Sequence, residues 1–304
     1  MSTELHSDSD APVEITLRRR RRWLIPAIAT AVVVVAAAVA FGLKGSSSPT
    51  VAGSHFGTDL QVAYEADSNS ELAFLQYLNA DIAPKYGLKI TPVGIGDGNQ
   101  LDLATANGQF AANIYQHQYW LAEVLAKTHW KLTAVHPVFQ WAYSMYSQKY
   151  PSINALPQGA TIALLNDPAN TAQALWLLNR AGKITFKPGT VPWYATTANI
   201  ASNPENYHFL FIDYGDGPRV LPEVDAVIAY NMQFIGAGTN QKYKIYAPPA
   251  PRSFAGQLVV STTYLHDPQI VKLIKVFLDP RVQAYLRTTT NPQLKDQLTP
   301  VSTS

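Results

Sequence analysis

Short apolar runs alternate along the first half of the chain with segments in which apolar residues recur every three or four positions. The runs are typical of buried strands, and the second pattern is typical of helices. The predicted strands cover residues 60–64, 88–93 and 110–115, and the predicted helices cover residues 72–82, 99–107 and 116–127. Strict alternation of strand and helix indicates a parallel sheet with helices on its faces.

A second block of the same kind begins near residue 150. Its predicted strands cover residues 160–165, 209–213 and 224–230, and a further strand over 257–261 belongs to the last part of the chain. The Asp-Pro pairs at residues 167–168 and 267–268 each supply an N-cap followed by proline at the first helical position, so each predicts a helix start.

The two blocks, with the chain returning to the first at its end, predict an α/β protein of two lobes around a cleft. We expect residues 58–142 and 235–304 to form lobe 1 and residues 143–234 to form lobe 2. Ligands of open α/β sheets bind beyond the carboxyl ends of strands, against helix N-termini. The residues after the strands at 110–115 and 160–165 are therefore the first candidates for a binding site.

The N-terminal segment has a different pattern. Residues 18–22 are five consecutive arginines, and residues 23–43 are almost entirely apolar. About 21 helical residues span about 31 Å, the thickness of a bilayer core. We expect a single N-terminal transmembrane helix over 23–43, with residues 1–22 as a cytoplasmic basic tail and 44–57 as a flexible linker. The alternative is a cleaved signal peptide, because Ala38-Val39-Ala40 has the small-x-small pattern of a cleavage site.

Composition limits the function classes. The chain has 304 residues and no cysteine, which excludes disulfides, thiolate zinc sites, cysteine nucleophiles and lipid attachment through a cysteine. Its net charge of +2 includes the five arginines of the N-terminal run. The rest of the chain is slightly acidic, so the composition offers no electrostatic case for binding nucleic acid.

Motifs of enzymes and metal sites are missing. The sequence contains no GxSxG, HExxH, Walker A or GxGxxG pattern, and its seven histidines are scattered without ligand-like spacing. We therefore expect a protein that is not an enzyme and that uses no cofactor or metal.

Four segments occur in an order that is informative as a set. Residues 112–121 read ANIYQHQYWL, 163–178 read ALLNDPANTAQALWLL, 203–206 read NPEN and 224–231 read VDAVIAYN. Together they resemble the NlpA/MetQ family of methionine-type binding proteins, and the resemblance covers residues 58–290. It implies a two-lobed type-II periplasmic binding protein fold that closes over its ligand. It also implies an ABC permease and ATPase as partners.

The resemblance assigns a ligand pocket. Tyr115, His117 and Trp120 match the family's pocket-lining Phe, His and Tyr, and aromatic rings suit the thioether of methionine. The alternatives are that Trp120 packs in the core and that His117 caps the helix. Asn166 follows a strand at the expected cleft, although a simple helix cap explains the neighbouring Asp-Pro pair as well. Trp141 precedes the expected crossing between lobes and is a further candidate.

The pocket also departs from the family pattern. Gln173 stands where the family has an arginine that pairs with the ligand carboxylate, and neutral glutamine cannot supply that charge-assisted pair. Gly98 stands where the family tends to have a tyrosine. The family's strand-end asparagine aligns with Tyr230, and Asn231 is one position late. Three changes in one pocket predict an altered specificity, with Arg219 and Arg252 as possible replacement cations.

The predicted site therefore comprises the residues Tyr115, His117, Trp120, Trp141, Asn166, Gln173, Tyr230 and Asn231. We interpret the chain as a monomeric, membrane-tethered, extracytoplasmic solute-binding component of an ABC importer for methionine or a related amino acid, dipeptide or derivative. The alternative is a membrane-tethered receptor or scaffold with a degenerate binding fold. Neighbouring genes for a permease and an ATPase would favour the importer interpretation, and their absence would favour the alternative.

Overall fold

The computed structural model describes residues 53–302. The predicted basic tail (1–22), the apolar segment (23–43) and most of the linker (44–57) lie outside this range. Among the described residues, no helix is both long and apolar enough to cross a membrane.

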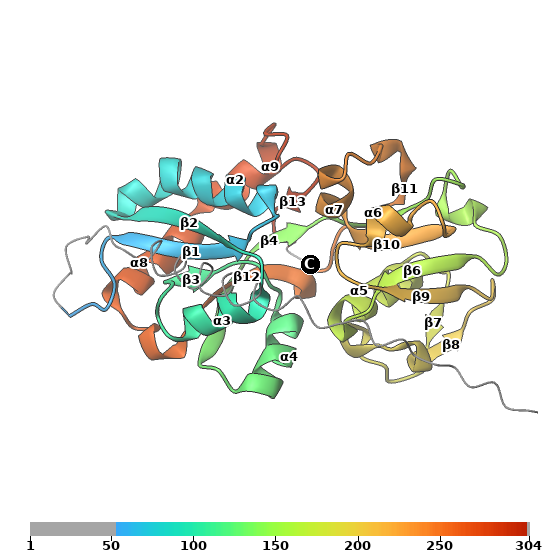
Figure 1. Ribbon diagram of the computed structural model, residues 1–304, viewed down its shortest axis with the longest axis horizontal. Coiled ribbons are helices and arrows are strands. Elements are labelled where there is room, and N and C mark those ends of the chain that lie inside the picture. Colours follow the sequence, from blue (N-terminus) through green and yellow to red (C-terminus); the bar gives the residue numbers. More distant parts are fainter. Residues whose placement is uncertain (1–52, 303–304) are drawn as a thin grey trace, which may run out of the picture. The chain divides into compact units, whose positions relative to one another are not determined.

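Within residues 53–302, the first of two main sheets has the strand order β13-β4-β12-β3-β1-β2 (Figure 1). Its strands are β1 (Asp59–Glu65), β2 (Lys89–Ile95), β3 (Ala112–Asn113), β4 (Leu132–Trp141), β12 (Ala255–Ser261) and β13 (Leu298–Thr299). β1 pairs in parallel with β2 and β3, whereas β12 runs antiparallel to β3 and β4. The return of the chain to its first sheet is thereby confirmed.

The second main sheet has the order β11-β5-β10-β6-β9. Its strands are β5 (Tyr143–Tyr146), β6 (Thr161–Leu165), β9 (His208–Ile212), β10 (Ala226–Tyr230) and β11 (Lys244–Tyr246), and a separate small sheet pairs β7 (Thr185–Phe186) with β8 (Ile200–Ser202). β6 is parallel to both of its neighbours, β9 and β10. β11 belongs to this sheet through its pairing with β5, although it lies within the range 235–304 that we expected in lobe 1.

Helices cover these sheets. They are α2 (Asn69–Tyr77), α3 (Gly98–Ala106), α4 (Gln118–Thr128), α5 (Pro168–Arg180), α6 (Gly217–Val220), α7 (Asn231–Gly236), α8 (Pro268–Phe277) and α9 (Pro280–Thr288). A π-helical turn covers Leu78–Ile82, and 3-10 turns cover Ala83–Tyr86, Ile153–Ala155, Pro192–Tyr194, Thr197–Asn199, Gln241–Tyr243, Arg252–Phe254 and Thr262–Tyr264. α2 packs on β1 and β2, α3 packs on β1, β3 and β12, and α5 packs on β6.

Side-chain caps define where these helices begin. The carboxylates of Asp97, Asp167 and Asp267 each accept a backbone N–H in the first turn of α3, α5 and α8. Ser68 caps α2 in the same way by accepting the N–H of Glu71. The Glu71 carboxylate accepts the backbone N–H of Glu65 instead of completing a capping box with Ser68.

The chain crosses between the main sheets at Ala142, the single residue between β4 and β5. The Ala142 N–H donates to the carbonyl of Gln297 at 2.9 Å, and its carbonyl accepts the N–H of Asn231 at 2.9 Å. The chain crosses back between β11 and β12. The second crossing contains only the 3-10 turn Arg252–Phe254. Short connections of this kind are typical of lobes that move relative to each other.

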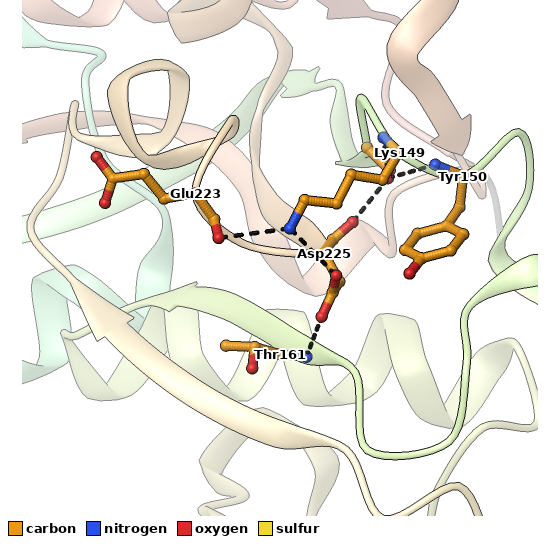
Figure 2. Close-up of polar contacts among 6 residues, drawn as sticks. Lys149, Tyr150, Thr161, Glu223 and Asp225 are labelled. Atoms are coloured by element: carbon orange, nitrogen blue, oxygen red, sulfur yellow. Dashed lines mark hydrogen bonds and ion pairs between the residues drawn. The ribbon is translucent and has the colours of Figure 1, made fainter.

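A polar network holds the amino ends of β6 and β10 together (Figure 2). The Asp225 carboxylate accepts the backbone N–H of Thr161 at 2.8 Å and lies 3.3 Å from the Lys149 ammonium. The Asp225 carbonyl accepts the Ser147 hydroxyl at 2.6 Å. Because this network lies at the amino ends of the parallel strands, the opposite, carboxyl ends are left to form a site.

Candidate ligand-binding site

A cavity of about 250 Å³ is lined by residues from both main sheets. The residues from the first sheet and its helices are Glu65, Gly98, Tyr115, Gln116, His117, Trp120 and Trp141, and those from the second are Asn166, Asp167, Asn170, Tyr214, Tyr230 and Met232. Most of them follow the carboxyl end of a strand, where open α/β sheets place ligands. The volume suits a ligand of about amino-acid size.

The turn between β3 and α4 supplies an aromatic wall. Tyr115 and Trp120 both line the cavity, as predicted. The indole N–H of Trp120 is buried and has no hydrogen-bond partner of normal geometry among the described residues. It lies near the Tyr115 hydroxyl, where it opposes the rise that burial causes in the pKa of Tyr115.

Asp102 organises this wall from α3. Its carboxylate accepts the Tyr115 hydroxyl at 2.7 Å, the Gln116 amide at 2.6 Å and the Asn113 amide at 3.0 Å. Burial raises the pKa of Asp102 to about 6, and the three hydrogen bonds oppose that rise. These three contacts make Asp102 the support of the pocket wall.

Gly98 leaves room for the Tyr115 ring. A Cβ atom at position 98 would lie 3.1 Å from the ring and 3.1 Å from its hydroxyl. Any side chain at position 98, including the tyrosine that the family pattern favours, would therefore require the Tyr115 ring to shift. The departure from the family at position 98 is thus coupled to the position of the Tyr115 ring.

His117 is a neutral, buried cap. It is only 3% exposed, and its Nδ1 atom accepts the backbone N–H of Trp120 at 3.2 Å. Burial lowers the pKa of His117 to about 4, and a hydrogen bond with the Asn170 side chain opposes this shift. The cap and the pocket interpretations both hold, because the same ring lines the cavity.

On the second sheet, Asn166 and Asp167 lie between β6 and α5 and line the cavity. The Asn166 amide donates to the Asp213 carboxylate. Asp167 accepts the backbone N–H of Asn170 at 2.8 Å and its side-chain amide at 2.9 Å. The amino end of α5 therefore already holds a carboxylate of the protein.

Tyr230, at the carboxyl end of β10, lines the cavity as predicted. Its hydroxyl lies 2.6 Å from the side-chain oxygen of Asn170 and 3.3 Å from that of Gln173. Gln173 is 1% exposed and stands behind Tyr230, outside the cavity lining.

Asn231 does not line the cavity either. Its side chain donates to the carbonyl of Asp296 at 3.0 Å, beside the crossing at Ala142. Arg219 pairs with Asp216 at 3.0 Å, and Arg252 donates to the Ser302 carbonyl at 2.9 Å. Neither arginine lines the cavity, so neither replaces the cation that position 173 lacks.

A pair of glutamates closes the first-sheet side. Glu65 lines the cavity at the end of β1 and accepts the hydroxyl of Tyr214, from the second sheet, at 3.3 Å. Glu71 is buried behind it and accepts the Trp141 indole N–H at 3.1 Å. Burial and the charge of Asp67 raise the pKa of Glu65 to about 7, while the Tyr214 hydrogen bond opposes the rise. Burial and the charge of Glu65 raise the pKa of Glu71 further.

Six of the eight predicted residues come together in the cavity, and the structure adds others. Gln116 and Met232 adjoin predicted residues in the sequence, and Asn170 lies three residues before Gln173. Glu65 and Tyr214 had no sequence signal beyond their place after a strand. Among the described residues, no three His, Asp or Glu side chains cluster as a metal site.

Comparison with known proteins supports a common architecture. The NlpA lipoprotein family matches residues 62–298. The chain belongs to the NlpA lipoprotein family. A similar protein of this kind is Lipoprotein 28 of Escherichia coli O157:H7, 35% identical over 146 residues, which cover 47% of this chain and 53% of that protein. The matched segment thus spans about half the length of this curated relative.

Two further proteins that the chain is similar to have methionine in their descriptions. The probable D-methionine-binding lipoprotein MetQ of Pasteurella multocida (strain Pm70) is 29% identical over 196 residues, or 64% of this chain and 70% of that protein. A nutrient-binding protein from Burkholderia cenocepacia, solved bound to methionine, has a TM-score of 0.66 and 27% identity, covering 79% of this chain and 98% of that structure. The mixed α/β, two-lobed, periplasmic-binding-like fold of this family is the fold described above.

Proposed function

We propose that this chain is the extracytoplasmic solute-binding component of an ABC importer and captures methionine or a related amino acid, dipeptide or derivative. The observation that carries the proposal is the aromatic cavity lined by both main sheets. A ligand there contacts both lobes, so its binding favours the closed form over the open one. A permease with its ATPase is the partner that would read the closed form.

The proposed location follows from the N-terminal pattern. We place residues 23–43 in the membrane as a single anchor, with the binding domain outside the cytoplasm. The relatives are named lipoproteins, whereas this chain has no cysteine for lipid attachment. An apolar helix after five arginines would hold the domain at the same surface by other means.

Binding is tested on the full chain in detergent, unfolded and refolded to remove any carried-over ligand. Melting temperatures are recorded with L- and D-methionine, methionine dipeptides, other amino acids and carboxylate-blocked derivatives. A compound that binds only the folded protein raises the melting temperature by mass action. We expect a rise with at least one member of the panel. No rise with any member contradicts the proposal and favours the receptor or scaffold interpretation.

The site is tested by Tyr115→Ala and Asn166→Ala, one from each side of the cavity. Each is expected to reduce the affinity for the identified compound about tenfold or more, because each removes a lining side chain. Tyr246→Ala on β11, outside the lining, is the matched control. Unchanged affinity in both cavity variants would show that this cavity is not the site.

A further inference from the structure

The charge of the cavity distinguishes it from a site for a free amino acid. Glu65 and Asp167 line it, and no lysine or arginine is among its described lining residues. His117 is neutral near pH 7 because burial lowers its pKa to about 4. A ligand carboxylate would therefore meet two acidic side chains and no cation.

The hydrogen-bond donors that a carboxylate needs are already engaged. The hydroxyls of Tyr115, Tyr214 and Tyr230 donate to Asp102, Glu65 and Asn170, respectively. The amino end of α5 is capped by its own Asp167. The Trp120 indole N–H makes no hydrogen bond of normal geometry among the described residues, but it lies near the Tyr115 hydroxyl.

In contrast to the donors, a hydrogen-bond acceptor of the cavity lining remains unpaired. Gln116 is 2% exposed and lines the cavity, and its side-chain oxygen has no hydrogen-bond partner among the described residues. Both neighbours of its nitrogen, the Asp102 carboxylate and the Asn113 side-chain oxygen, are acceptors, so the nitrogen must face them. A buried, unpaired carbonyl oxygen calls for a donor from the ligand.

Aromatic rings complete this arrangement. Tyr115, Trp120, Trp141, Tyr214 and Tyr230 all line the cavity. The face of an aromatic ring attracts a cation, most strongly where water is excluded. Rings, a carboxylate and an unpaired carbonyl oxygen together form an environment for a charged nitrogen.

We propose that the cavity binds a small organic cation, which is an amine or quaternary ammonium compound without an ionised carboxylate. Its nitrogen lies among the aromatic rings and pairs with the Glu65 carboxylate. Where that nitrogen carries an N–H, the Gln116 side-chain oxygen accepts it. This inference rests on the proposed function and names its substrate class. The inference offers one physical explanation for the changes at positions 98, 173 and 230. The pocket has lost the cation for a carboxylate and retains acceptors for an ammonium.

The test compares matched probes on the refolded full chain by isothermal titration calorimetry. L-Methioninamide is a cation, L-methionine a zwitterion and N-acetyl-L-methionine an anion, and all three share one side chain; choline is a cation with none of it. We expect L-methioninamide or choline to bind about tenfold to a hundredfold more tightly than L-methionine, because a carboxylate here lacks a charge-assisted partner. N-Acetyl-L-methionine is expected not to bind.

Two variants separate charge from shape. Glu65→Gln is expected to weaken binding of the cationic probe about tenfold, whereas the exposed Glu223→Gln is the matched control and should not. Gln173→Arg, which introduces the missing cation behind Tyr230, is expected to shift the preference toward L-methionine. Binding of choline, whose charge does not change with pH, should also strengthen as pH rises through about 7, where Glu65, facing Tyr214, Glu71 and Asp67, ionises.

The outcomes are distinct. Tighter binding of L-methionine than of both cations by the unmodified chain overturns the organic-cation inference and leaves the solute-binding function standing. Absence of binding by all four probes also overturns the organic-cation inference, whereas the solute-binding function fails only if no member of the melting-temperature panel binds.

Discussion

At the residue scale, the cavity depends on a few side chains whose roles arise from their neighbours. Tyr115 occupies the space that Gly98 leaves open, and Asp102 fixes its hydroxyl at 2.7 Å. Tyr230 stands between Asn170 and Gln173 in the same manner. Changes at single positions in such a site are therefore coupled rather than additive.

The first prediction concerns the pH dependence of stability. Because the pKa of Glu65 rises from 4.5 to about 7 on folding, the folded chain binds more protons than the unfolded chain between these values. Stability from this group is thus present below about pH 4.5 and is lost as pH rises toward 7. Because glutamine does not titrate, the free energy of unfolding of Glu65→Gln should fall by about 1–3 kcal/mol less than that of the unmodified chain over this pH range.

The measurement is thermal unfolding of the full chain and the variant between pH 5 and 8. The advantage of Glu65→Gln should grow with pH and level off above about 7, since the raised pKa sets the end of the window. Asp102 titrates in both proteins, so the difference reports Glu65 together with its coupled partner Glu71. Glu223→Gln should show no such growth. An advantage that is equal at all pH values would contradict the prediction.

At the element scale, the amino and carboxyl ends of the parallel strands have separate tasks. Asp225 joins the amino ends of β6 and β10 (Figure 2). The carboxyl ends of the same strands carry Asn166 and Tyr230 into the cavity. Fixing one end of a strand pair sets the position of the residues at the other end.

The second prediction tests this network. Asp225→Ala leaves the Thr161 N–H without its acceptor and should lower the free energy of unfolding by about 1–3 kcal/mol. Lys149→Ala removes only a partly exposed ion-pair partner, with 40% of the lysine side chain exposed. It should cost less than about 1 kcal/mol. Thermal unfolding of both variants measures the difference. Equal losses of stability would show that the ion pair, and not the hydrogen bond to the Thr161 N–H, accounts for the stabilisation.

At the scale of the whole described domain, an aromatic cluster joins the two lobes beside the cavity. Tyr119 of α4 and Phe254 come from the first lobe, and Trp193 and Tyr194 come from the second. The Trp193 ring centroid lies 6.4 Å from that of Tyr119 and 5.7 Å from that of Phe254. Tyr194 makes an edge contact with Tyr119 at 5.3 Å. These contacts exist only while the lobes are together, so they favour the closed form.

The third prediction follows from this cluster. Trp193→Ala should raise the open population and weaken ligand affinity about threefold to tenfold, since an aromatic pair contributes about 0.5–1.5 kcal/mol. The chain has no cysteine, so Leu103→Cys and Leu210→Cys, both at exposed positions, allow dye labelling of one site on each lobe. Without ligand, single-molecule energy transfer should then report a longer mean distance between the two dyes in Trp193→Ala than in the unmodified chain. Val191→Ala, at a nearby exposed position, is the control and should behave like the unmodified chain.

The sequence by itself determined the local elements. Apolar runs at 60–64 and 160–165 became β1 and β6, and the Asp-Pro pairs began α5 and α8, because burial pattern and capping act within a few residues. The sequence pattern predicted strands poorly where a strand pairs with a partner far along the chain. The expected strand over 110–115 is only β3, and β4 and β13 were missed, since their partners lie far along the chain.

Only the tertiary structure decided which side chains share the cavity. Asn231 and Gln173 follow the right elements, yet one side chain turns to the Asp296 carbonyl and the other stands behind Tyr230. Glu65 and Tyr214 are 149 positions apart and meet only when the two lobes face each other. The physical reason is that a sequence pattern assigns a residue to a strand end or a helix face, whereas packing between distant elements sets its direction and its charge environment.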